Sequence, residues 1–337
     1  MTEKHYGGSA GFGFKGIQSD SKSQHAQQVS RQKEKKQSVE KSETLDEYES
    51  YIKAGKLTSE AVKYARSIVK KGVPLIELAE KIEAKIKELG GKPAFPVNLS
   101  INEIAAHYSP AYDDKTTASG LMKVDIGVHI DGFAADTAFS IDLENSDTNK
   151  RLIESAESAL KEGLKVVKES KNIGEIGKAI STSVQSNGFE PIRNLSGHSI
   201  EEGQLHAGIT IPNYDSGQDI ELDSGVYAIE PFVTNGAGLV RDGKPSGIYE
   251  VQKEGSVRDS FAREVLTFIL EEYGTLPFCS RWIYKQFGSR GLLALRNIES
   301  AGLLHHYTQL VEKAGGIVAQ AEHTIIISDK GIEIITL

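Results

Sequence analysis

Apolar side chains recur at helical spacing in several stretches of the chain, and glycine or proline ends some of them. Gly72-Val-Pro74 separates the first two stretches and Gly90-Gly91 closes the second, as expected for helix ends. Thr44-Leu-Asp-Glu47 has the spacing of a capping box and predicts a short helix before them. The predicted helices cover residues 59–72, 75–89, 148–170 and 174–187, and a further helical pattern runs over 259–302.

Between Met122 and Leu143 the apolar period changes to two, which is typical of strands. Asp131-Gly132 in the middle is a strong signal for a two-residue hairpin turn. In such a hairpin Asp125 faces Ala138, and Asp136 projects from the same face as Asp125. Other strands are predicted at 204–211, 224–234, 319–327 and 332–337. Helices and strands segregated in this way indicate an α+β fold.

Four acidic residues lie in apolar surroundings. Asp125 and Asp136 would share one patch of the hairpin, where unpaired carboxylates are costly, although two solvent-facing aspartates on a half-exposed hairpin explain this segment equally well. Glu230 and Glu322 each lie inside an apolar strand pattern, and glutamate is almost never fully buried without a partner. No equally regular set of lysines or arginines accompanies these acids, so bound cations are favoured.

His198, in Gly197-His-Ser-Ile, is the fifth candidate for this site. The four carboxylates would be neutralised by two divalent ions but not by one. An oxygen-rich set with one imidazole suits Mn, Co, Fe or Zn, and differs from the Cys/His sets of structural zinc. Two such ions can share a water molecule and lower its pKa, which indicates hydrolysis at a carbonyl or phosphoryl centre.

Composition excludes several classes of protein. The 337 residues are 39% hydrophobic and 26% charged, as in globular proteins, and a net charge of −8 argues against a general nucleic-acid binder. No apolar stretch is long enough for a membrane span, and the first residues lack a secretory signal. The single cysteine, Cys279, cannot form an intrachain disulfide and is interpreted as a small buried hydrophobe. We therefore expect a cytoplasmic monomer.

Residues 1–43 differ from the rest, because they are polar and basic with few aliphatic side chains. They predict a flexible tail preceding a catalytic domain at 44–337. Their excess of lysine and arginine suits contact with an anionic surface such as ribosomal RNA on the ribosome, while a merely solvated tail is the alternative.

Several longer motifs follow one another from about residue 59 to the C-terminus, and with them the chain resembles the type 2 methionine aminopeptidases, most closely their archaeal members. The motifs include Lys92-Pro-Ala-Phe-Pro-Val-Asn, Asp125-Ile-Gly-Val-His-Ile-Asp-Gly, Asn194-Leu-Ser-Gly-His198, Leu205-His-Ala-Gly208, Ala228-Ile-Glu-Pro-Phe232 and Tyr273-Gly-Thr-Leu-Pro-Phe278. The resemblance implies the pita-bread (creatinase/aminopeptidase) fold, in which two pseudo-symmetric halves surround a metal-bearing antiparallel sheet. It also implies a helical type 2 insert at about 250–306.

The resemblance gives each candidate ligand a role in a centre of two divalent ions. Asp125 would bind one ion, and His198 and Glu230 would bind the other. Asp136 and Glu322 would bridge the two ions. Glu230 would also act as general base for a hydroxide, held between the metals, that attacks the scissile carbonyl.

The activity implied is the removal of the initiator methionine from nascent polypeptides, with a preference for a small second residue. His107 and His206 match the family histidines that contact the scissile peptide. Phe95, Leu205 and Tyr307 fall where the family lines its methionine pocket.

Two other functions share this fold. Prolidases and proline-specific aminopeptidases use a similar ligand set, but they usually carry a substantial folded N-terminal domain. A non-catalytic relative that binds ribosomes or RNA would have lost metal ligands, whereas all five positions are filled here. Ala321 stands where the family usually has phenylalanine, which leaves the packing beside Glu322 open.

Overall fold

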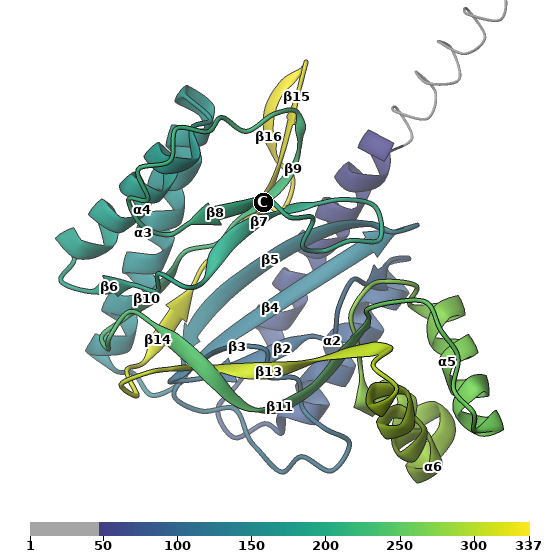
Figure 1. Ribbon diagram of the computed structural model, residues 1–337. Coiled ribbons are helices and arrows are strands. Elements are labelled where there is room, and N and C mark those ends of the chain that lie inside the picture. The colour runs from purple at the N-terminus through teal and green to yellow at the C-terminus, as the bar shows by residue number, and fades with distance from the viewer. Residues whose placement is uncertain (1–46) are drawn as a thin grey trace, which may run out of the picture. The chain divides into compact units, whose positions relative to one another are not determined.

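The longest hairpin of the fold forms where the sequence predicts it. The computed structural model describes residues 47–337, and in it β4 (Leu121–Ile130) pairs with β5 (Phe133–Asp142) in antiparallel register (Figure 1). Asp125 pairs with Ala138 and Asp136 with Gly127, as predicted. Asp131 and Gly132 both have positive φ, 51° and 95°, which a two-residue turn of this kind requires.

Two helices pack against the back of this hairpin. One runs over residues 47–68 and the other is α2 (Leu75–Glu88). Their apolar faces form one core with β2 (Asn98–Ile101), β4 and β5. The predicted helix start at residue 44 lies outside the described residues, whereas the predicted break before a helix at 59–72 was wrong, because one continuous helix runs from 47 and ends at 68.

A second pair of helices packs against another group of strands. These are α3 (Asp147–Glu169) and α4 (Ile173–Ser186), both within about a residue of their predicted bounds. Ser146 and Asn172 cap their N-termini by accepting hydrogen bonds from backbone N–H groups. The helices cover a five-stranded antiparallel sheet with the order β16-β15-β9-β7-β8 (Figure 1). Its strands are β7 (Ser196–Ile200), β8 (Thr210–Pro212), β9 (Gly225–Ile229), β15 (His323–Ser328) and β16 (Gly331–Ile334).

The strand predicted at 204–211 was largely wrong. Only residues 210–212 pair as a strand, while the strand that carries His198 lies earlier and was not predicted. The alternation in 196–200 is weak because four of its five residues are buried.

The last helices, α5 (Ser260–Glu272) and α6 (Ser280–Ser300), form a separate apolar core. The helical pattern predicted over 259–302 is interrupted between them at 273–279. The pair packs beside a sheet with the order β12-β11-β13-β3. Its strands are β3 (Ile104–Ala106), β11 (Val240–Val251), β12 (Phe278–Cys279) and β13 (Leu304–Glu312). Whether residues 250–306 form an insert in the family sense stays a prediction.

The remaining short strands complete an architecture in which every strand pairing of the described residues is antiparallel. They are β1 (Lys92–Pro93), β6 (Glu190–Pro191), β10 (Phe232–Thr234) and β14 (Val318–Gln320). The predicted tail, residues 1–43, and the start of the predicted domain at 44 lie outside the described residues. Among the helices from residue 47 onward, none has the length and apolarity to cross a bilayer.

Candidate metal centre

Strands from distant parts of the chain bring the five predicted ligands together. Asp125 and Asp136 come from the β4–β5 hairpin, and His198 comes from β7. Glu230 follows β9 directly, and Glu322 lies between β14 and β15. His198 pairs with Ala228 across the sheet, and His323 with Ile229, so these three segments meet side by side.

Ligand atoms of the five residues form two overlapping clusters. Asp136, His198 and Glu322 offer atoms that all lie within 4.8 Å of one another, and so do Asp125, Glu230 and Glu322. Glu322 belongs to both clusters, as a bridging ligand would. Glu230 is grouped with Asp125 here, whereas the resemblance pairs it with His198.

Backbone and side-chain hydrogen bonds fix the positions of these acids. The Thr324 hydroxyl accepts from Asp136 N at 2.8 Å and donates to Asp136 O at 2.7 Å. Thr137 Oγ1 donates to Glu322 O at 2.6 Å. Gln320 Nε2 donates to Glu230 Oε1 at 2.7 Å, which orients that carboxylate. These hydrogen bonds do not use the remaining carboxylate oxygens, which are therefore available to bind a ligand.

Several of those oxygens are buried and have no partner among the described residues. They are Asp125 Oδ1, Asp136 Oδ1 and both carboxylate oxygens of Glu322. Burial raises the pKa of all four carboxyl groups, and that of Asp125 to about 7. Because a buried carboxylate needs a compensating charge, the donor set fits divalent cations.

The imidazoles at the site are neutral. Burial lowers the pKa of His198 to about 3, and its Nε2 lies 3.8 Å from Asp136 Oδ2. Neutral imidazole is the form that binds metal. Burial also lowers the pKa of His206, whose ring lies 4.5 Å from that of His198, and the pKa of His107 to about 4. A neutral imidazole has one N–H group, and that of His107 is on Nδ1, where it donates to Thr308 O, so His107 Nε2 is an acceptor.

A cavity of about 300 Å³ opens over these groups. Phe95, Leu205 and Tyr307 line it, as the resemblance implies, together with His107 and His206. Four predicted ligands also line it, namely Asp125, Asp136, His198 and Glu230. The fifth, Glu322, is 1% exposed and does not line this cavity.

Comparisons with known proteins agree with this site. Residues 49–328 match the model of metallopeptidase family M24. The chain is 43% identical to the methionine aminopeptidase of Methanocaldococcus jannaschii, over 87% of its own length and 99% of the relative's. It is 46% identical to that of Thermococcus onnurineus, over 87% of its own length and the whole relative. The chain belongs to metallopeptidase family M24.

Solved M24-like structures share the fold of this chain. The methionine aminopeptidase of Rickettsia prowazekii superposes with a TM-score of 0.62 at 22% identity, covering 87% of the chain and 97% of that structure. A thermophilic Arx1 gives 0.74 at 15% identity, covering 86% and 90%. The prolidase of Pyrococcus furiosus gives 0.54 at 17% identity, covering 87% of the chain but 64% of that structure. The pita-bread fold is thus confirmed.

Two side chains at the M24 site were missed by sequence analysis. Asn98 pairs with Asp125 across β2 and β4, lines the cavity, and has a buried Oδ1 without a partner in the described structure. Gln320 orients Glu230. Both are neutral amides whose role depends on strand register between distant segments, so no local signal marked them. Ala321 is buried in the core beneath α3 and α4 and leaves the ligand cluster intact.

Proposed function

We propose that this M24 chain removes the initiator methionine from nascent proteins whose second residue is small. Five side chains would hold two divalent ions: Glu322 belongs to both groups of ligand atoms, and the bridging role of Asp136 is the one that the resemblance implies. The observation that carries the proposal is the group of buried, partnerless carboxylate oxygens at the base of one cavity. Its neutralisation needs cations, and relatives up to 46% identical are methionine aminopeptidases.

The chain's own groups supply proton transfer and orientation. Glu230 keeps some exposure to the cavity, so its carboxylate can accept the proton of an attacking water. His107 Nδ1 bonds with Thr308 O at 3.2 Å, which leaves Nε2 for the substrate. His206 would donate to the peptide beside it. Bound metal ions would lower the pKa of the water and stabilise the developing oxyanion.

The methionine side chain would lie among apolar groups at one end of the cavity. Phe95 and Leu205 are buried, and the Tyr307 hydroxyl donates to Glu250 at 2.5 Å, which fixes its ring. Such a preformed apolar pocket suits an unbranched thioether side chain. The nature of the ions, from among Mn, Co, Fe and Zn, follows from metal supply as much as from ligand type.

The decisive experiment is a peptide panel with Met-Ala, Met-Gly, Met-Lys and Ala-Pro starts, assayed with each of these metals. Methionine release should be fastest from Met-Ala and Met-Gly, and slow from Met-Lys. Faster cleavage of the Ala-Pro peptide would favour a proline-specific enzyme instead. Absence of both turnover and bound metal would favour a non-catalytic binding protein.

A further inference from the structure

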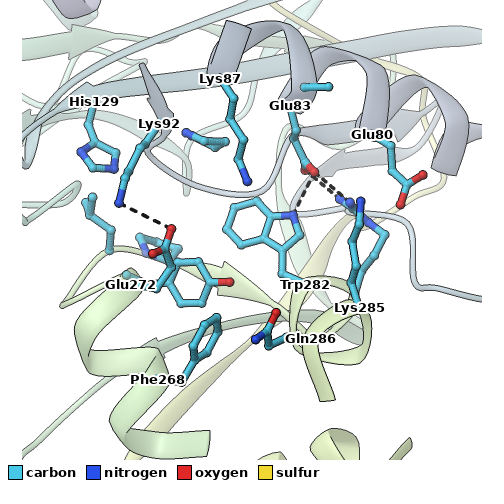
Figure 2. A pocket seen from close by; sticks show the side chains of 16 residues that line it. Glu80, Glu83, Lys87, Lys92, His129, Phe268, Glu272, Trp282, Lys285 and Gln286 are labelled. Carbon is cyan, nitrogen blue, oxygen red and sulfur yellow. Dashed lines mark hydrogen bonds and ion pairs between the residues drawn. The ribbon is translucent and has the colours of Figure 1, made fainter. Parts of the chain in front are cut away.

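A second cavity, of about 460 Å³, lies where α2 meets α5 and α6, outside the metal centre. Figure 2 shows charged side chains around an aromatic group. Of the residues that line it, only Pro277 also lines the metal-site cavity. Its volume is within the range of small-molecule sites, and the proposed function uses none of its charged groups.

Aromatic rings form one wall of this cavity. The Trp282 indole stacks on Tyr273 with a centroid distance of 5.3 Å and an interplanar angle of 30°. Tyr273 stacks in turn on Phe278, and Phe268 meets it edge-on at 5.9 Å. Trp282 Nε1 donates to Glu83 Oε2 at 2.9 Å, so the indole is held in one orientation. Trp282 is therefore held at the end of an aromatic stack, with one face of its indole against Tyr273.

Each acidic side chain that lines the cavity has a cationic side chain near it, and two further lysines have no acidic partner among the described residues. Glu83 forms a double hydrogen-bonded ion pair with Arg281, and Lys92 reaches Glu272 at 3.5 Å. The third acidic residue that lines the cavity, Glu80, helps to raise the pKa of the Arg281 guanidinium through its negative charge. Four cationic side chains and three carboxylates line the cavity, which makes it locally positive in a chain of net charge −8.

The unpaired lysines are Lys87 and Lys285. Within residues 47–337 neither has a hydrogen bond or ion pair, and in Figure 2 Lys87 extends from α2 toward the Trp282 indole. Lys285 lies one turn beyond Arg281 on α6 and lines the same cavity on the side of Glu80. Flexible ammonium groups next to a flat ring are suited to an anion attached to an aromatic group.

His129 adds a neutral donor. Burial, together with the charge of Lys92, lowers its pKa to about 4. Its Nδ1 accepts a hydrogen bond from Gly132 N at 3.1 Å, so the proton is on Nε2. The side chain lines the cavity on the side of Lys92.

We propose that this cavity binds a planar aromatic anion of the nucleoside monophosphate class. The base would stack on Trp282, and Lys87 and Lys285 would hold the phosphate. A purely apolar ligand would leave both ammonium groups unused, and a simple anion would leave the aromatic wall unused. Base stacking on aromatic side chains and lysine contacts to phosphate are both established modes of nucleotide recognition.

The intrinsic tryptophan fluorescence of the chain reports on this site, because Trp282 is its only tryptophan. Adenosine monophosphate should quench its fluorescence saturably. Adenosine should bind at least about tenfold more weakly, and inorganic phosphate should not quench. Competition by a 5′-phosphorylated oligonucleotide at lower concentration than the free nucleotide would assign the same site to an RNA end.

Matched variants test the residues. The double variant Lys87→Ala/Lys285→Ala should weaken nucleotide binding at least about tenfold by fluorescence and by equilibrium dialysis. Lys81→Ala is the control, because Lys81 lies on the same helix, pairs with Glu77 and is outside the cavity. Equal binding by the double variant and the parent, or equal affinity for adenosine and its monophosphate, would overturn the proposal. So would nucleotide binding that competes with the peptide substrate, since the phosphate would then be at the metal centre.

Discussion

At the scale of single residues, Asp136 depends on one hydroxyl group. Thr324 Oγ1 bonds to both the backbone N and O of Asp136, and both residues are buried. This contact fixes the position of the Asp136 backbone relative to β15. The fixed backbone limits where the Asp136 carboxylate can lie, as the proposed ligand role requires.

Asp136→Asn should lower kcat/KM for Met-Ala peptides by at least about 100-fold, because an amide is a poor bridge between cations. Metal content per chain should fall as well, measured by elemental analysis after dialysis. Asp147→Asn, at a side chain that is 99% exposed, serves as the control. A near-normal rate with full metal content would contradict the bridging role.

His206→Ala should reduce kcat by roughly 100-fold or more while metal content stays at the parent level. The imidazole lies beside His198 and lines the cavity without belonging to either ligand cluster. Steady-state kinetics and elemental analysis on the same preparation separate the two effects. If the variant loses its metal, His206 is a ligand and not a substrate contact.

The acidic residues of the candidate site could be predicted because each would be costly to bury unpaired, and the structure brings them together. Asp125 and Asp136 were placed on one face by the period of a strand and a two-residue turn, and the register agrees. Asn98 and Gln320 escaped notice because buried amides are common and only long-range pairing brings them to the ligands.

At the scale of elements, a buried ion pair joins α2 to α6. The two terminal guanidinium nitrogens of Arg281 donate to Glu83, at 2.8 and 2.7 Å, and Arg281 Nε donates to Pro110 O. Glu83 is 6% and Arg281 3% exposed. The pair thus connects the first helical layer to the predicted insert.

Glu83→Gln should lower the free energy of unfolding by about 3–5 kcal/mol, since it leaves the Arg281 charge buried and unpaired. Urea unfolding followed by circular dichroism measures the change. Glu77→Gln on the same helix breaks only an exposed pair and should cost less than about 1 kcal/mol. A loss of less than about 1 kcal/mol for Glu83→Gln would mean that water reaches the Arg281 guanidinium.

Prediction of the elements followed the strength of the local pattern. Helices α3 and α4 were correct because amphipathic periodicity and polar caps agree at both N-termini. Strands β11 and β13 were missed, because β11 contains register shifts against β13 and a proline, Pro245, that disrupt alternation. Their pairing is a tertiary property that no short window contains.

At the scale of the whole molecule, folding buries neutral histidines from several elements. Burial lowers the pKa of His129, His107 and His323 to about 4. Between about pH 6.5 and 4 the unfolded chain therefore binds protons that the folded chain excludes. At these histidines, stability is therefore lost as the pH falls through this window, whereas the raised pKa of the site carboxyl groups acts in the opposite direction.

His129 offers the test, since it lies outside the metal ligands and accepts a bond in the hairpin turn. Its contribution to this loss should be on the order of 2 kcal/mol, allowing for partial exposure to water. The difference in unfolding free energy between pH 6.5 and 4, from urea titrations, should be smaller by that amount in His129→Asn. An unchanged difference would show that folding does not lower the pKa of His129.

Glu322 is the last of the five candidate ligands in the sequence, so it is the last of them to be translated. A chain translated only as far as Gln320 already carries Asp125, Asp136, His198 and Glu230, yet it lacks the residue shared by both clusters. Maturation of the centre must therefore wait for β15 to emerge and pair with β9.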